Sequence, residues 1–207
     1  MTQTERASSA SSGTEIDDVR SGTWLLLATL LQAPPDESML ERLRRGIHAS
    51  GADDPLDRAW QALRRRSCAA SPDAVDAEFH ELFIGLGRGE LVPYASWYRI
   101  GFLMDRPLVE LRRDLAALGL RRRGGNCEPE DHAASIAETM ALLADRESAF
   151  DPSTQARLFR EHVDSWMPHF FADLQPAPCA DFYRAVGELG AAFVGFERRF
   201  LQEAVAA

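Results

Sequence analysis

The 207-residue sequence has no lysine, no closely paired cysteines and no long apolar run. Its longest apolar run, residues 24–31, is far shorter than the roughly 18 residues that mark a membrane-spanning helix, so no membrane span is predicted. Residues 1–13 are rich in Ser, Thr and Ala and lack the apolar centre of an export signal. We therefore expect a disordered N-terminal tail over residues 1–15 and a cytoplasmic location.

Cysteine is scarce, and the three that occur, Cys68, Cys127 and Cys179, lie far apart. This number and spacing indicate neither a disulfide framework nor a structural zinc site, and Cys127 is expected to be a bystander thiol. A cofactor signature is also missing. The glycines of Gly85-Leu-Gly-Arg-Gly89 have no preceding strand and no following Lys-Ser/Thr, as a phosphate-binding loop would. No cofactor is predicted.

The net charge of −9 is unevenly distributed. Residues 128–207 hold 14 Asp and Glu against 6 Arg, a balance of −8, whereas residues 1–127 hold 18 acids and 17 Arg, a balance of −1. An acidic half repels nucleic acid and attracts cationic ligands, so no nucleic-acid partner is predicted. Solvated acidic helix faces would produce the same imbalance without any ligand.

What the sequence does contain is helical periodicity along nearly its whole length, with no convincing strand. The length and a 45% hydrophobic content suffice for one core. These features predict an all-α fold, a single domain of about eight to ten helices over residues 16–207, with a hinge at residues 144–153 that would permit helix swapping into a homodimer. Helices are expected over residues 17–31, 36–50, 55–66, 71–85, 107–118, 128–144, 153–174 and 181–204.

A loop at residues 84–94 is expected from its glycines and Pro93, yet it is apolar and is followed by Trp97 and Tyr98. Such a loop either packs into the core or lines a groove. The surrounding aromatic residues fit core packing, and they also fit a hydrophobic groove that binds a peptide.

The stretch Glu128-Pro-Glu-Asp-His132 is expected to open the helix over residues 128–144. Pro129 suits the first turn of a helix, and carboxylates are favourable near its positive end. His132 is in register with Ile136 and Met140, at the edge of the apolar face. A helix cap, a ligand-contacting site and a metal or catalytic site all remain open for this stretch. Across the whole chain the histidines lack the spacing of three or four residues that helical metal sites use, so no metal site is predicted from them, and no Ser/His/Asp set can be assembled to predict a catalytic site.

Three stretches in order resemble the signatures of a known family. They are Glu78-Phe-His-Glu-Leu-Phe-Ile-Gly85, Pro93-Tyr-Ala-Ser-Trp-Tyr98 and Glu128-Pro-Glu-Asp-His132, and a weaker fourth match runs from Phe159 to Pro168. The family is the TorD/DmsD/NarJ-like group of cytoplasmic chaperones for molybdoenzymes. This chain departs from it at Phe79 and Tyr94, where the family can carry Trp, and at Leu86, where the family often has Pro.

The resemblance implies a chaperone and not an enzyme. Its partners would be the twin-arginine signal peptide and the apo-form of a molybdenum-cofactor oxidoreductase, which it would hold before export. The peptide-binding residues that it implies are Phe79, Leu82, Phe83, Pro93, Tyr94, Trp97, Glu128, Pro129, Asp131 and His132. Among these, Asp131 is the candidate arginine acceptor, His132 its orienting partner, and Phe79, Leu82, Phe83 and Tyr94 the wall of a groove. Two rival functions are an all-helical metal-dependent hydrolase and a helical adaptor with an unrelated partner.

Overall fold

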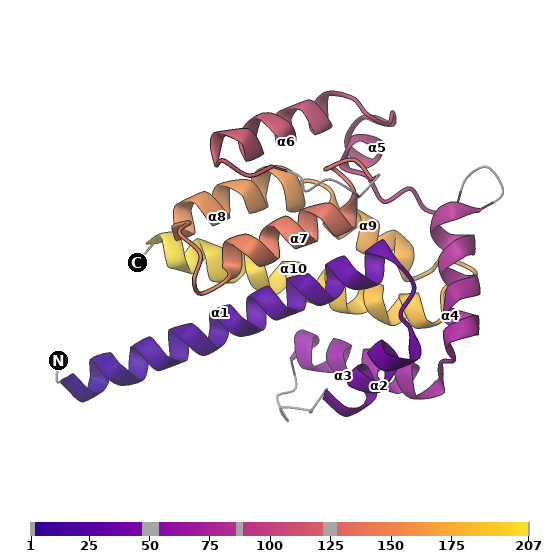
Figure 1. Cartoon of the computed structure of the whole chain (residues 1–207), viewed down its shortest axis with the longest axis horizontal. Helices are drawn as coiled ribbons and strands as arrows, with labels where there is room; N and C mark the ends of the chain where they lie inside the picture. Colours follow the sequence, from indigo (N-terminus) through magenta and orange to yellow (C-terminus); the bar gives the residue numbers. More distant parts are fainter. Residues whose placement is uncertain (1–2, 47–53, 86–88, 122–127, 207) are drawn as a thin grey trace.

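The computed structural model describes residues 3–46, 54–85, 89–121 and 128–206, with side chains from residue 15 onward (Figure 1). These ranges form ten α-helices and two π-helical segments and contain no strand, which confirms the all-α prediction. The elements are α1 (Gln3–Gln32), α2 (Glu37–Gly46), α3 (Pro55–Ala69), α4 (Pro72–Phe79), η1 (His80–Ile84), α5 (Ala95–Ile100), α6 (Arg106–Ala117), α7 (Ala133–Ala144), α8 (Pro152–Leu158), η2 (Phe159–Val163), α9 (Met167–Leu174) and α10 (Phe182–Ala206).

Three helices begin with a polar cap followed directly by proline. The side chains of Asp54, Ser71 and Asp151 each accept a hydrogen bond from the backbone N–H three residues later. Proline at the next position loses no hydrogen bond, because the first N–H groups of a helix have no partner within it. The sequence therefore fixes the starts of α3, α4 and α8 locally.

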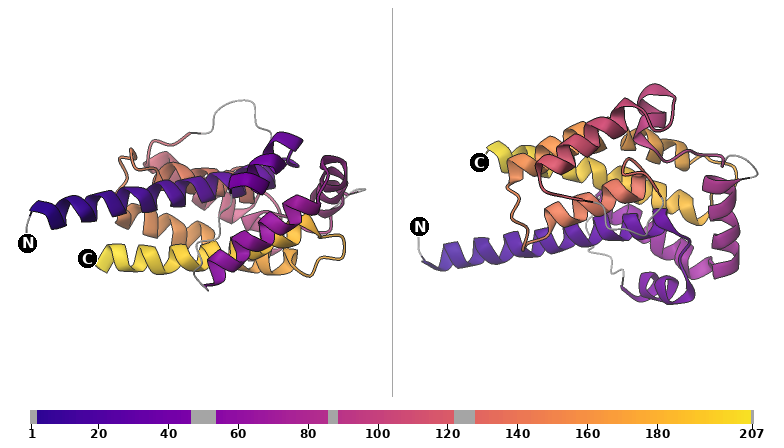
Figure 2. Two further views of the ribbon diagram at one scale, coloured as in Figure 1. Left: turned by 90° about the horizontal axis from the view of Figure 1, so that it is seen from below. Right: turned by 45° about the horizontal axis from the view of Figure 1, so that its top comes forward.

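The core forms where the long helices pack together. α1 lies along α7, and α10 packs against α3, α8 and α9 (Figures 1 and 2). Trp24 of α1 and Phe193 of α10 are fully buried and meet edge to face, with ring centroids 5.0 Å apart. α6 lies at the outer edge of the molecule, beside α5 and α8 (Figure 1). None of the described helices is long and apolar enough to cross a membrane.

Three expectations about the elements were wrong. α1 begins at Gln3, so helix replaces the disordered tail expected over residues 1–15; extending a formed helix costs little, because each added residue brings one hydrogen bond. α7 begins at Ala133 and not at residue 128. The helix expected over residues 153–174 is divided into α8, η2 and α9, with Pro168 in the first turn of α9. The short helix α5 was not anticipated.

Both π-helical segments fall within the stretches that carry the family resemblance. η1 covers His80–Ile84 and is followed by Gly85, whose φ of 58° is readily adopted only by glycine. η2 covers Phe159–Val163. A π-helix widens the turn and frees carbonyl groups, and such bulges are frequent at functional sites. The carbonyls of Glu81 and Leu82 accept hydrogen bonds from the N–H groups of Glu90 and Leu91, at 3.2 and 2.8 Å.

Candidate functional site: a clasp between two sequence motifs

Two motifs separated by more than thirty residues lie side by side in the structure. The N–H of Ala95 donates to the carbonyl of Asp131 at 2.9 Å, and the N–H of Ala133 donates to the carbonyl of Pro93 at 2.8 Å. Between them Tyr94 and His132 form an isolated antiparallel bridge. We call the paired residues 93–96 and 128–133 the clasp. It joins the start of α5 to the start of α7.

Asp131 holds the clasp from inside. Its side chain is 1% exposed, and its Oδ2 accepts hydrogen bonds from the Ser96 backbone N–H at 3.0 Å and from the Ser96 hydroxyl at 2.5 Å. Its Oδ1 is buried and has no hydrogen-bond partner. This position corrects the expectation that Asp131 receives a guanidinium at the surface, because an incoming arginine has no direct access to a carboxylate this deeply buried.

His132 caps α7. Its Nδ1 accepts a hydrogen bond from the backbone N–H of Ala134 at 3.1 Å, so this nitrogen carries no proton. Burial lowers the pKa of the His132 imidazole, although the charges of Glu128 and Asp131 act in the opposite direction. The imidazole is therefore neutral at pH 7. The motif is indeed a helix cap, but the capping residue is the last of the five and the carboxylates precede the helix.

Two tyrosines one helical turn apart each donate to a carboxylate. The hydroxyl of Tyr94 donates to Glu128, and the hydroxyl of Tyr98 donates to Asp173 of α9 at 3.1 Å. Burial, followed by hydrogen bonding to Glu128, raises the pKa of Tyr94. Burial and the charge of Asp173 raise that of Tyr98. Both hydroxyls thus remain protonated donors. We call these four residues, Tyr94, Tyr98, Glu128 and Asp173, the acid–tyrosine face.

The remaining predicted residues of these two motifs lie around this face. Pro93 is buried, while Trp97 and Pro129 are half-buried. The carbonyl of Pro129 accepts the N–H of His132 at 3.1 Å, which shapes the turn before α7. Glu130 pairs with Arg112 of α6 at 2.7 Å. The clasp therefore contacts α6 as well as α5 and α7.

Two apolar residues of the first motif, Phe79 and Leu82, lie in the core. Phe79 is 7% exposed and Leu82 is fully buried, whereas Phe83 is half-buried. Phe79 and Phe83 pack on Tyr183 of α10, with centroid distances of 5.8 and 5.4 Å. This corrects the expectation that Phe79 and Leu82 form the wall of an accessible groove. Leu86, Gly87, Cys127 and the arginines Arg122 and Arg123 lie outside the described residues.

Sequence reasoning missed several residues that shape the site. Ser96 was part of a quoted motif, and its hydroxyl beside Asp131 could have suggested a buried hydrogen bond. Asp173 carried no signal, since its partner Tyr98 is 75 residues away in sequence. Glu78 accepts the backbone N–H groups of residues 181, 182 and 183 at 2.7–3.1 Å and so caps α10 from α4.

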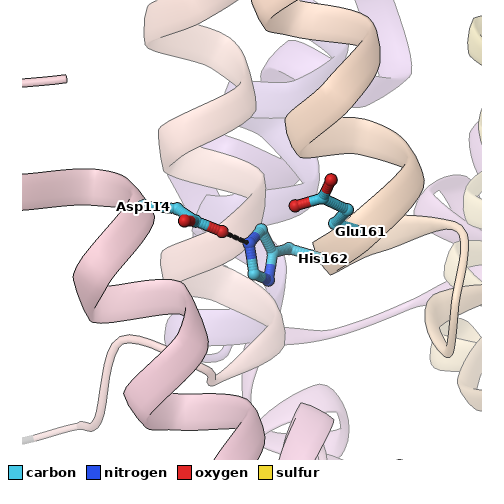
Figure 3. Close-up of side chains that lie close together, drawn as sticks. All are labelled: Asp114, Glu161 and His162. Carbon is cyan, nitrogen blue, oxygen red and sulfur yellow. Dashed lines mark hydrogen bonds and ion pairs between the residues drawn. The ribbon is translucent and has the colours of Figure 1, made fainter. Parts of the chain in front are cut away.

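One group among the described residues has the composition of a metal site. Ligating atoms of Asp114, Glu161 and His162 lie within 4.8 Å of one another (Figure 3). His162 bonds Asp114 at 2.8 Å, and burial of Asp114 is outweighed by hydrogen bonds from His162 and Arg113, which lower its pKa. Arg157 lies 3.8 Å from Asp114 and 3.7 Å from Glu161. These guanidiniums already neutralise the carboxylates, so the group is an ionic contact between α6 and η2 and a poor site for a cation.

Known proteins similar to this chain are chaperones by name. It is 29% identical over 138 residues to the chaperone protein TorD of Vibrio cholerae, covering 62% of this chain and 63% of that protein. It is 26% identical over 174 residues to TorD of Vibrio parahaemolyticus, covering 79% and 80%. The match therefore spans slightly less than two thirds of the Vibrio cholerae protein.

The fold is shared with a solved structure. The crystal structure of a protein described as a redox enzyme maturation protein, from Archaeoglobus fulgidus, superposes with a TM-score of 0.54 at 19% identity, covering 88% of this chain and 93% of that one. The sequence model of the nitrate reductase delta subunit family matches residues 50–172, more than half of the chain. The resemblance to TorD/NarJ-like proteins is thereby confirmed, and the chain belongs to the nitrate reductase delta subunit family.

Proposed function

We propose that this protein is a cytoplasmic chaperone that assists the maturation of a molybdenum-cofactor oxidoreductase by binding its twin-arginine signal peptide before export. The relatives named as chaperones support the general role, and they agree with the expectation that the chain is not an enzyme. The finer role, peptide recognition, rests on the acid–tyrosine face.

That face is the observation that carries the proposal. Glu128 and Asp173 each accept a hydrogen bond from a tyrosine hydroxyl, and the two tyrosines, Tyr94 and Tyr98, are four residues apart in the sequence. A carboxylate has about four lone-pair sites, so it can accept hydrogen bonds from more than one donor. Guanidinium groups bind carboxylates in a bidentate manner that lysine cannot reproduce. Two carboxylates that are each bonded to a tyrosine of this short segment would thus complement a peptide with two adjacent arginines.

The other predicted residues support this face from behind. Asp131 and His132 fix the clasp, and with Pro93 and Pro129 they set the position of Tyr94 and Glu128. Trp97 lies on the same short helix as the two tyrosines. Phe79, Leu82 and Phe83 are the buried and half-buried apolar side chains of the first motif. In this proposal Glu128 and Asp173 replace Asp131 as the arginine acceptors.

Calorimetric titration with a twin-arginine signal peptide tests the proposal. The substitutions Glu128→Gln and Asp173→Asn are expected to weaken binding by about 1–3 kcal/mol each, because each removes a charge-assisted hydrogen bond. Replacing both peptide arginines by lysine should produce a similar loss. Glu203→Gln, on the exposed end of α10, is the matched control and should leave the affinity unchanged.

Two results would contradict this function. One is the absence of binding to the signal peptide of every molybdoenzyme encoded beside the gene. The other is a tightly bound transition metal in stoichiometric amount in the purified protein, which would favour the metal-dependent hydrolase instead. Equal affinity for the Arg-Arg and Lys-Lys peptides would be compatible with a chaperone or an adaptor. It would reject the acid–tyrosine face as the arginine-binding site of the protein.

A further inference from the structure

The clasp contains a further carboxylate that is bound to an arginine of the same chain. Glu130 lies two residues after Glu128, and its side chain is 20% exposed, whereas Asp131 is 1% exposed. The Nε and Nη2 atoms of Arg112, in α6, lie 2.8 and 2.7 Å from Oε2 of Glu130. A guanidinium of the protein therefore occupies a partly exposed carboxylate in the stretch that supplies one acceptor of the proposed peptide site.

Arg112 differs from the other arginines of α6 in the place of its partner. Arg106 pairs with Glu110 at 3.0 Å, and Arg113 pairs with Asp114 at 3.2 Å, both within the helix. Arg112 instead reaches the clasp, 18 positions further along the sequence. Its side chain is 53% exposed, and ion pairs at the surface contribute little free energy. The contact between Arg112 and the clasp can therefore be broken easily.

The position of α6 does not depend on this ion pair. Leu111 is 3% exposed and belongs to the hydrophobic core, and Asp114 bonds His162 of η2 at 2.8 Å. These contacts hold α6 against the rest of the molecule without Glu130. Releasing Glu130 thus requires only a change in the side-chain rotamer of Arg112, which is a fast movement for an exposed side chain.

We propose that Arg112 is an internal competitor, which occupies Glu130 in the free protein and yields it to an arginine of the bound peptide; this rests on the proposed function. The exchange replaces one guanidinium by another at the same carboxylate. Because the peptide needs the state in which Arg112 has left Glu130, its affinity is lowered by the fraction of the protein in that state. Arg112 thereby limits the affinity for arginine-containing segments and keeps Glu130 neutralised while no peptide is bound.

Calorimetric titration of the full chain with a synthetic peptide that contains two adjacent arginines tests this competition. Arg112→Gln removes the competitor, Glu130→Gln removes the contested carboxylate, and the double variant removes both. Arg146→Gln is the matched control, because the Arg146 side chain is also 53% exposed, pairs with the carboxylate of Asp18 at 3.7 Å and causes the same change in net charge when replaced. Circular dichroism and thermal melting check that each variant is folded.

We expect Arg112→Gln to bind the peptide about two- to fivefold more tightly than the wild type, because a surface ion pair no longer has to be broken on binding. Arg146→Gln should bind as the wild type does. Without the contested carboxylate there is nothing to compete for, so the double variant should bind with the affinity of Glu130→Gln. A merely structural role of Arg112 would produce a loss of affinity and not a gain that depends on Glu130.

Three outcomes would reject the competition. If the wild type binds the peptide and Arg112→Gln binds it equally or more weakly, the inference is overturned while the proposed function stands. An equal gain in Arg146→Gln, or in the double variant relative to Glu130→Gln, would assign the effect to the overall charge of the protein and would also overturn the inference. If neither the wild type nor Arg112→Gln binds the peptide, the proposed function and the inference fail together.

Discussion

At the scale of single residues, the neutral imidazole of His132 makes folding sensitive to pH. Folding lowers the pKa of His132, because burial penalises the charged form more than Glu128 and Asp131 favour it. The folded state therefore binds fewer protons than the unfolded state below the usual histidine pKa of about 6.5. The stability from this group is fully present above that pKa and declines as the pH falls below it, by at most about 1.4 kcal/mol per pH unit.

The pH dependence of the unfolding free energy can be measured by urea unfolding of the wild type and His132→Asn. The pH range from about 7.5 to about 5 brackets a pKa of about 6.5. Asparagine is a good cap residue and does not titrate, so the variant should keep much of the capping and lose part of the pH dependence. His169→Asn, exposed on α9, is the control and should retain the wild-type slope. An identical pH dependence in wild type and His132→Asn would show that the imidazole is not held neutral by burial.

At the scale of elements, η1 depends on the close approach of Gly89. A Cβ atom at position 89 would lie 2.5 Å from the backbone carbon of Phe83 and 2.6 Å from the carbonyl oxygen of Leu82. Backbone atoms cannot move aside as a flexible side chain can. Gly89→Ala is therefore expected to destabilise the protein by about 1–3 kcal/mol, the usual range for overpacking.

Gly22→Ala in α1 is the matched control for this prediction. No atom lies within 4 Å of a Cβ at position 22, and alanine is favoured over glycine inside a helix by roughly 0.5–1 kcal/mol. Thermal unfolding should thus show opposite shifts for the two glycine-to-alanine changes. A Gly89→Ala protein as stable as the wild type would mean that residues 89–91 do not pack on η1 as the structure shows.

The elements also show what the sequence could and could not predict. Helix starts such as Ser71-Pro72 were predictable, because cap and proline act within one turn. The start of α7 was predicted five residues too early, because Pro129 also suits the first turn of a helix. The boundary is set by the pairing of residues 131–133 with residues 93–95. No local feature of the sequence indicates this pairing. The burial of Asp131 depends on the same pairing, and Asp173 reaches the site only through tertiary packing.

At the scale of the whole molecule, a buried ion pair joins the first helix to the last. Arg20 of α1 donates to both carboxylate oxygens of Glu197 in α10, at 2.7 and 3.1 Å, and to Gln155 of α8 at 2.9 Å. Its guanidinium lies 4.1 Å from the ring centroid of Phe200. Arg20 is 2% exposed and also pairs with Asp17 at 2.9 Å, whereas Glu197 is fully buried and depends on Arg20 to compensate its charge. Removing one partner is expected to cost about 3–5 kcal/mol.

A double-mutant cycle tests this pair. Arg20→Met and Glu197→Met each leave a buried charged group without this partner, whereas the double variant Arg20→Met/Glu197→Met leaves neither charge and should be more stable than Arg20→Met alone. Arg146→Met, which breaks the exposed pair with Asp18 at 3.7 Å, should cost less than about 1 kcal/mol. A loss of stability in Arg20→Met no larger than that in Arg146→Met would show that the buried Arg20–Glu197 pair does not hold α1 and α10 together.

The same unfolding curves address helix swapping. The expected hinge, residues 144–153, contains the connection between α7 and α8. A dimer swapped there would place α8 to α10 of one chain on α1 of another, and the Arg20–Glu197 pair would join two molecules. Stability that depends on association rises with protein concentration. A swapped dimer therefore predicts a urea midpoint that increases with concentration in the wild type, whereas the contacts described here, made within one chain, predict a constant midpoint.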